Sequence, residues 1–214
     1  IRTTHERLAR VTHNDYDREI ALVVEGEEDG EKAIFWRDGH YWYYDFNHHT
    51  QINITANVPV SFVKKDHDYY GSRPAYGFVG WVKNHDSVIV NHQLDLWQLP
   101  LDGKSQAVNL TAAGRGDQPI RFRLIHLNRD RKTSREERYI NLSGVNLLSA
   151  FHIKTKYAGY FQLSDKGIKK LVYRPASYEH SRWRPGIVKA KDSNILVFKM
   201  GSYQDYPESF LSDT

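Results

Sequence analysis

The chain has 214 residues, of which 40% are hydrophobic, 13% aromatic and 26% charged. This composition is typical of a globular protein and excludes disordered, collagen-like and coiled-coil chains. Thirty Lys and Arg residues against 26 Asp and Glu residues give a formal net charge of +4. The sequence contains no cysteine, which excludes disulfides, thiolate zinc sites and cysteine nucleophiles. Every apolar run is interrupted well before the roughly 18 residues that a bilayer crossing needs, so we predict no membrane span.

The beginning of the chain carries no secretory signal, because Ile1 to Arg10 contain no apolar stretch. The only methionine is Met200, so Ile1 is not a translation start. We therefore expect the chain to be a processed product or a piece of a longer protein.

The positive charge does not predict a nucleic-acid partner. The densest basic stretch, residues 128–138, interleaves three acidic residues with five basic ones and offers no continuous positive surface. We interpret it as a solvated hairpin loop. Arg121 and Arg123 flank Phe122, and strand alternation places both arginines on one face. A solvent-facing strand explains them equally well.

Short runs rich in β-branched and aromatic residues recur between turn signals along the chain, whereas helical periodicity is hard to find. The predicted strands include, in chain order, residues 20–24, 41–46, 76–82, 87–90, 147–151 and 195–198. Asp38-Gly39 and Asp102-Gly103 predict tight turns, because glycine takes the positive φ that primed hairpin turns require. The sequence therefore predicts an all-β chain.

The strands repeat. Residues 80–88 and 186–194 align without gaps and share Gly, Val, Lys, Asp and Ser. Their separation of 106 residues corresponds to two units of about 53. Aromatic strands at residues 44–46, 95–97, 159–161 and 208–210 recur at a similar interval, each as the third strand of a four-stranded antiparallel meander. This pattern is typical of a β-propeller blade.

We therefore predict a single partial β-propeller over residues 1–214, with blades at about 8–56, 76–112, 119–173 and 186–214. In the first blade, the first strand is expected to end at residues 13–15, followed by a buried second strand and by the aromatic third strand at residues 44–46. The last blade is expected to be incomplete, because it stops after its third strand. Such an open edge could pair with a second copy to give a homodimer.

Specific segments carry a family resemblance. Residues 201–214, which include Tyr206-Pro207-Glu208, resemble the blade that precedes the hydrolase domain in the prolyl oligopeptidase and dipeptidyl peptidase IV group of serine peptidases. Residues 95–103, followed by Val-Asn-Leu-Thr at 108–111, are similar to propeller hairpins of that group. Residues 147–160 and 187–193 resemble a bacterial branch with large exported peptidases. The resemblance spans roughly residues 17–214.

The resemblance implies a propeller that gates and binds peptide substrate for a downstream α/β-hydrolase domain with a Ser-Asp-His triad. It also implies an exported protein, periplasmic or extracellular. The sequence has no Gly-x-Ser-x-Gly nucleophile elbow, so no catalytic residue is assigned and this chain alone is not expected to be an enzyme. The expected partners are the peptide substrate and the protein's own catalytic domain, without a cofactor.

Dipeptidyl-cleaving members of the group hold the substrate amino terminus with a Glu pair from the propeller. Glu27 and Glu28 are the substrate-binding candidates that this implies, with Glu136 and Glu137 as the other adjacent pair. Both pairs lack the aromatic context of the family's helix.

Histidines and carboxylates do not predict a metal site. His48 and His49 are adjacent, and adjacent side chains on a strand point to opposite faces. Residues 66–68 and 13–17 contain enough oxygen ligands for Ca²⁺ but lack the ordered spacing of a dedicated loop.

Two further features have competing interpretations. Three Asn-x-Ser/Thr sequons begin at Asn53, Asn109 and Asn141, and we place two of them in fourth strands and the last in a first strand. The tryptophans could stack on a sugar, although packing between blades is the commoner use; they are Trp36, Trp42, Trp81, Trp97 and Trp183. The alternative function is therefore a free-standing propeller that binds a glycan or a protein partner.

Overall fold

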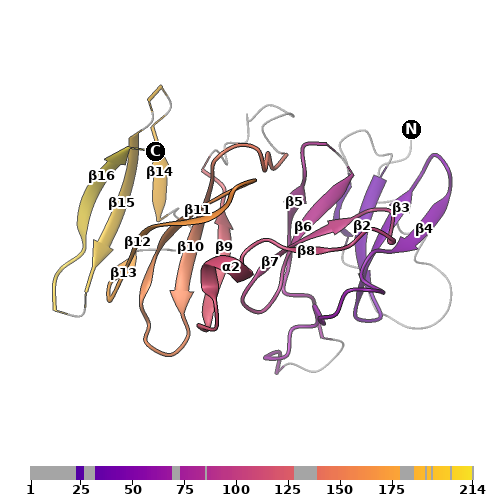
Figure 1. Ribbon diagram of the computed structural model, residues 1–214, viewed down its shortest axis with the longest axis horizontal. Coiled ribbons are helices and arrows are strands. Elements are labelled where there is room, and N and C mark those ends of the chain that lie inside the picture. Colours follow the sequence, from indigo (N-terminus) through magenta and orange to yellow (C-terminus); the bar gives the residue numbers. More distant parts are fainter. Residues whose placement is uncertain are drawn as a thin grey trace. The chain divides into compact units, whose positions relative to one another are not determined.

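The computed structural model describes residues 23–26, 32–68, 73–84, 86–127, 139–178, 186–190, 192–193, 195–202 and 204–213. The chain divides into two compact units, Ile1–Asn109 and Leu110–Thr214, and each contains two four-stranded antiparallel sheets (Figure 1). The helix α2 (Ala112–Arg115) is a single turn. The prediction of an all-β chain built from four-stranded antiparallel sheets is confirmed, and the fold is consistent with a partial β-propeller.

The first sheet is a simple meander of β1 (Val23–Gly26), β2 (Lys32–Arg37), β3 (His40–Asp45) and β4 (Thr50–Asn53). Of the strand predicted at residues 20–24, Val23 and Val24 lie in β1, the first strand of this sheet. The second strand is β2, in which four successive residues from Ala33 to Trp36 are at most 8% exposed. A strand covered on both faces has a continuous apolar run and no alternation, so its sequence carries a weaker strand signal. The predicted first strand ending at residues 13–15 lies outside the described residues.

The turn between β2 and β3 has the geometry predicted for Asp38-Gly39. Asp38 has φ 51° and Gly39 has φ 76°, and the flanking residues Arg37 and His40 pair across the turn. Positive φ at both central residues defines a type I′ hairpin, whose twist matches that of the strands. The Arg37 guanidinium lies over the Trp42 ring at 4.3 Å, and Trp42 in turn stacks on Phe35.

The second sheet is a meander of β5 (Phe78–Trp81), β6 (Ser87–Asn91), β7 (Leu96–Pro100) and β8 (Val108–Asn109). The strand predicted at residues 87–90 is β6, and all four of these residues are buried. In the same unit, Phe62 lies on the segment between the two sheets. Its ring contacts Tyr41 of β3 at 5.9 Å and Trp97 of β7 at 6.2 Å between centroids. This aromatic cluster joins the first sheet to the second.

The third sheet is formed by β9 (Ile120–Ile125), β10 (Asn146–His152), β11 (Ala158–Ser164) and β12 (Gly167–Arg174), again in chain order. Phe122 is fully buried while Arg121 is exposed, as the alternation predicts. Residues 128–138, interpreted from sequence as a loop, lie outside the described residues. A close backbone approach occurs at Gly159, where a Cβ would clash with the Val172 carbonyl oxygen.

The sequon at Asn141 does not lie in a first strand, as we had predicted, because β9 is the first strand of its sheet. Asn141 lies in a turn before β10, where its Oδ1 accepts a hydrogen bond from the Ser143 N–H at 3.2 Å. Asn and Ser side chains compete with strand pairing by bonding to nearby backbone, which favours turns. Asn53 and Asn109 do lie in fourth strands, β4 and β8.

The fourth sheet departs from the simple meander. Its strands are β13 (Ser177–Tyr178), β14 (Ile187–Lys189), β15 (Ile195–Gly201) and β16 (Glu208–Asp213). Strand β16 pairs with β15 from Ile195 to Met200, so β13 and β14 share the opposite edge of β15. Among the described residues, no strand pairs with the outer edge of β16.

The third and fourth sheets pack face to face through an apolar cluster in the second unit. Its buried members are Leu147, Tyr160, Ile187 and Leu196, and partly buried side chains around them include Val172 and Phe198. Each of β10, β11, β14 and β15 supplies one of these buried residues, so the facing sides of the two sheets pack together as neighbouring layers.

Candidate functional site

The substrate-binding candidates from the sequence cannot be placed. Glu27 and Glu28, together with the alternative pair Glu136 and Glu137, lie outside the described residues. The same is true of Trp183 and of residues 13–17. The described part of the chain contains no group of three His, Cys, Asp or Glu residues that could hold a metal ion. Within that part, no helix has the length and hydrophobicity of a membrane span.

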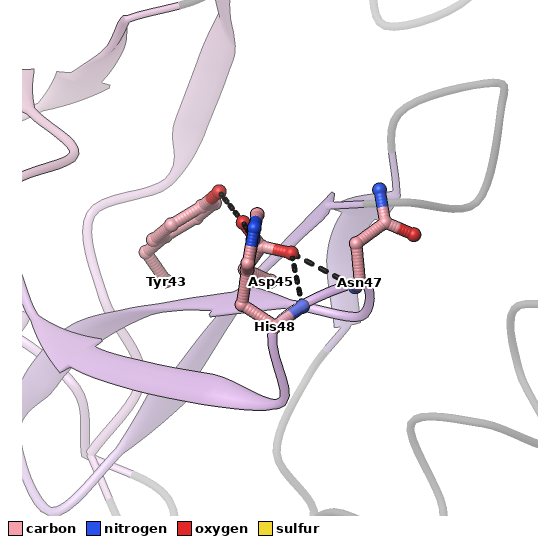
Figure 2. Close-up of polar contacts among 4 residues, drawn as sticks. All are labelled: Tyr43, Asp45, Asn47 and His48. Atoms are coloured by element: carbon pink, nitrogen blue, oxygen red, sulfur yellow. Dashed lines mark hydrogen bonds and ion pairs between the residues drawn. The ribbon is translucent and has the colours of Figure 1, made fainter.

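The best-organised polar cluster in the first unit surrounds Asp45, the last residue of β3, in the turn toward β4 (Figure 2). Its Oδ1 accepts hydrogen bonds from the backbone N–H of Asn47 at 2.8 Å and of His48 at 3.1 Å. Its Oδ2 accepts from His48 Nδ1 at 3.0 Å and from the Tyr43 hydroxyl at 3.4 Å. Both carboxylate oxygens are therefore fully used inside the turn.

These contacts set the charge of Asp45. The side-chain hydrogen bond from His48 is the largest cause that lowers the pKa of Asp45, to about 2, and the backbone N–H groups of His48 and Asn47 lower it further. An ionised carboxylate can only accept hydrogen bonds, so His48 Nδ1 must carry the proton. The Nε2 atom of this largely exposed histidine then faces solvent as an acceptor when the ring is neutral.

The Asp45–His48 pair has two of the three parts of a catalytic triad. A carboxylate orients a histidine, which could act as a general base through Nε2. The third part is missing among the described residues, because no serine or threonine hydroxyl hydrogen bonds to His48. Within the described part of the chain, the pair therefore has no nucleophile beside it, and the geometry shown does not support acyl transfer at this turn.

A second turn shows that the Asp45 arrangement is a repeated structural device. Asp102 follows β7, the third strand of the second sheet, as Asp45 ends β3. Its Oδ1 accepts from the N–H of Lys104 and of Ser105, each at 2.9 Å. In both turns, the aspartate Oδ1 therefore accepts hydrogen bonds from the backbone N–H groups two and three residues further along the chain. Hydrogen bonds from Ser105 are the main cause that lowers the pKa of Asp102.

His48 and His49 lie in the turn after Asp45 and not on a strand. The expectation that strand alternation points their side chains to opposite faces is therefore wrong. His49 has φ 51°, and its Nδ1 lies 3.4 Å from the Tyr44 hydroxyl, whereas His48 contacts Asp45. The two imidazoles therefore have separate partners. The turn chemistry of Asp45 and Asn47 was the signal in the sequence that could have placed them here.

The tryptophans of the described residues pack in the protein, as the commoner interpretation holds. Trp36, Trp81 and Trp97 are at most 8% exposed. Trp42 is half-buried; it stacks with Phe35, and the Arg37 guanidinium lies over its ring at 4.3 Å. The three buried rings therefore offer no exposed face of the kind that stacks on a sugar.

Comparison of the sequence with models of known protein families and with curated proteins finds no match.

Proposed function

We propose that this chain is the non-catalytic β-propeller portion of a serine peptidase of the prolyl oligopeptidase type. In this role it gates and binds peptide substrate for an α/β-hydrolase domain encoded downstream. The observation that supports the proposal is where two segments that resemble the family, residues 95–103 and 201–214, lie in the repeated sheets. Asp95 directly precedes the third strand of the second sheet, β7, and is 4% exposed. Glu208 opens β16, which pairs with β15 in the fourth sheet.

The chemistry of the described residues agrees with a binding role. The best-organised carboxylate–histidine pair, Asp45 and His48, has no nucleophile beside it among the described residues, and the sequence has no nucleophile elbow. A fold by itself does not define function, so the proposal depends on the segments that carry the resemblance. Export to the periplasm or the extracellular space belongs to the same proposal.

Two experiments test the proposal together. The purified chain, assayed with a proline-containing dipeptide chromogenic substrate, should show no turnover. The coding sequence that follows residue 214 should contain an α/β-hydrolase pattern with a Gly-x-Ser-x-Gly elbow, and the extended protein should cleave the same substrate. A stop codon, or a continuation without that pattern, would contradict the proposal and favour a free-standing propeller.

Two further parts of the proposal, export and dimer formation, are tested separately. Fractionation of cells that make the natural protein should recover it from the periplasm or the medium, and recovery from the cytosol would contradict export. The outer edge of β16 is the surface on which a homodimer would form. Sedimentation equilibrium of the chain measures this directly, and a monomer at every concentration would remove the dimer from the proposal.

A further inference from the structure

Strand β9 forms one edge of the third sheet, and its geometry is regular. It pairs with β10 over all six of its residues without a register shift, and no described strand pairs with its other side. By contrast, the edge strands β1, β5 and β12 each pair through a register shift that marks a bulge. Bulges hinder the pairing of an edge with another chain, and β9 lacks this protection.

The register shows which backbone groups of β9 point outward. The Ile153 N–H donates to the Pro119 carbonyl at 3.0 Å, so these two residues form a hydrogen-bonded pair that continues the β9–β10 ladder. Hydrogen-bonded and non-hydrogen-bonded pairs alternate along an antiparallel ladder, so the odd-numbered residues of β9 bond to β10. The N–H and C=O groups of Phe122 and Leu124 therefore point away from β10, toward the open edge.

The strand is held firmly while its edge stays accessible. Phe122 is fully buried and Ile120 is 6% exposed, so their side chains anchor β9 in the sheet. At the edge, Arg123 Nη1 donates to the Phe122 carbonyl at 2.6 Å. This contact comes from a flexible side chain of the same strand. The backbone N–H of an added strand can replace it at the carbonyl, and the guanidinium then becomes available to a carboxylate.

The side chains of β9 differ between the two faces of the sheet. Arg121 and Arg123 lie on one face, and the strand contains no acidic residue. The residues between and beside them lie on the other face and are apolar: Ile120, Phe122 and Leu124. Directly opposed residues of neighbouring strands stabilise a sheet when their charges are opposite or when both are apolar. An added strand therefore fits best when its acidic and apolar residues alternate.

A second cation lies near Arg121. The Arg121 guanidinium carbon is 5.5 Å from the ring centroid of Phe151, its neighbour on β10, and Lys156 Nζ is 5.6 Å from the same centroid. Both distances fall within the range of cation–π attraction. Among the described residues, no carboxylate forms an ion pair with Arg121 or Lys156. An acidic side chain opposite Arg121 would therefore meet positive charge that no described carboxylate neutralises.

We propose that the open edge of β9 binds an extended peptide in which acidic and apolar residues alternate, as an added fifth strand of the third sheet. The peptide backbone pairs with the outward groups of Phe122 and Leu124. Its acidic residues lie opposite Arg121 and Arg123 in non-hydrogen-bonded pairs, where opposed side chains are closest. This inference rests on the proposed function for the kind of ligand, and it adds where the peptide binds and which side chains it carries.

The backbone of the edge, and not its charge, selects a peptide over other anions. Outward N–H and C=O groups recur at every second residue, about 6.8 Å apart, and another extended polypeptide repeats its own donors and acceptors at the same interval. A sugar acid or a phosphate can contact Arg121 but has no such series of donors and acceptors. The two contributions can be separated, because N-methylation removes a peptide N–H group without changing the charge of the peptide.

The test uses the whole chain and the fluorescently labelled peptide Thr-Glu-Val-Glu-Val-Glu-Thr, followed by fluorescence anisotropy. We expect saturable binding that weakens as salt increases, because exposed charges are screened. N-methylation of both valines removes the N–H groups that face β9 and should weaken binding at least about tenfold. N-methylation of the last two glutamates is the matched control and should leave binding nearly unchanged, because these N–H groups face away. The scrambled peptide Thr-Val-Val-Glu-Glu-Glu-Thr has the same charge and should bind at least about tenfold more weakly.

Hydrogen exchange measured by NMR locates the bound peptide. The Phe122 and Leu124 amides point toward the open edge, so their exchange should become slower when the peptide is bound. The Arg121 and Arg123 amides already pair with β10, and their exchange should change much less.

Variants of the protein test the same edge from the other side. L124P removes one outward N–H group at an edge position, where proline is tolerated, and should bind the peptide about fivefold more weakly than L124A. L124A loses the same side chain but keeps the N–H group. R121Q should weaken binding about threefold. Its control is K166N, since exposed Lys166 lies in the β11–β12 turn at the opposite end of the sheet. Circular dichroism and urea unfolding check that each variant is folded.

Three results would overturn the proposal. The first is no binding of the alternating peptide by the wild-type chain. The second is equal binding of the valine-methylated or the scrambled peptide, which would show general attraction to anions. The third is unchanged exchange of the Phe122 and Leu124 amides at saturating peptide, which would place the peptide elsewhere. These measurements need no hydrolase domain, so their failure is distinct from failure of the peptidase proposal, which the sequence after residue 214 and the turnover assay decide.

Discussion

Replacing Asp45 tests whether the turn after β3 is held by an ionised carboxylate. Asp45 is only 18% exposed at its side chain and receives four hydrogen bonds from Tyr43, Asn47 and His48. In D45N the amide oxygen can still accept the backbone N–H bonds, but the attraction to the histidine ring is lost. D45N should therefore destabilise the protein mainly through the loss of charge.

The expected loss of stability in D45N follows from the pKa of Asp45, which is lowered from 3.8 to about 2 in the folded protein. Each pH unit of difference in a pKa corresponds to about 1.4 kcal/mol, so the upper limit is roughly 2.5 kcal/mol. His48 is 76% exposed, and solvent screens the interaction. We therefore expect D45N to lower the free energy of unfolding by about 1 kcal/mol at pH 6.

The pH dependence has a definite sign. The folded pKa of Asp45 is depressed below the unfolded value, so its contribution to stability is fully present above about pH 4. It is lost as the pH falls toward about 2, where the folded protein also binds the proton. The stability difference between wild type and D45N should therefore shrink across this window.

Urea unfolding at pH 6 and at several values between pH 4 and pH 2.5 measures this difference. A double-mutant cycle with H48Q should give a coupling free energy of roughly 0.5 to 1 kcal/mol. NMR titration of the Asp45 side-chain carbon gives the midpoint independently of unfolding. A D45N protein as stable as wild type at pH 6, or a midpoint near 3.8, would refute the reasoning.

The remaining predictions concern packing. G159A should lower the free energy of unfolding by more than about 2 kcal/mol, because its Cβ would clash with the Val172 carbonyl oxygen in a close-packed sheet. G144A has its nearest contact at 3.4 Å and should change stability by less than about 0.5 kcal/mol; equal effects would contradict this. F62A should cost about 3 to 5 kcal/mol in urea unfolding, because Phe62 is 1% exposed. Tyr206 is 92% exposed, so Y206A should leave the free energy of unfolding nearly unchanged. An F62A protein as stable as Y206A would show that the cluster of Tyr41, Phe62 and Trp97 does not hold the two sheets together.

Much of the local structure was predictable because it depends on neighbouring residues. Alternation placed Phe122 inside and Arg121 outside, and Asp38-Gly39 specified a turn that only residues tolerant of positive φ adopt readily. The apolar residues from Val88 to Val90 identified a buried strand. Each of these features follows from steric preference and burial within a few residues.

Errors arose where pairing decided the role of a segment. The run from Ala33 to Trp36 is apolar in any context, but only its position between β1 and β3 makes it the second strand. Asn141 precedes a strand closely enough to be mistaken for part of one, and its side-chain hydrogen bond to Ser143 determines the turn. His48 and His49 were expected on a strand, whereas the carboxylate of Asp45 closes a turn around them.

By itself, the sequence determined the all-β class and the repeat of four-stranded units, because strand periodicity and turn residues are local properties. Only the tertiary structure brought Arg121 and Lys156, 35 positions apart in the chain, to the same Phe151 ring. It did so through the register of β9 against β10 and through the turn closed by His152. Strand register depends on many distant side chains at once, and it decides which charges share a surface.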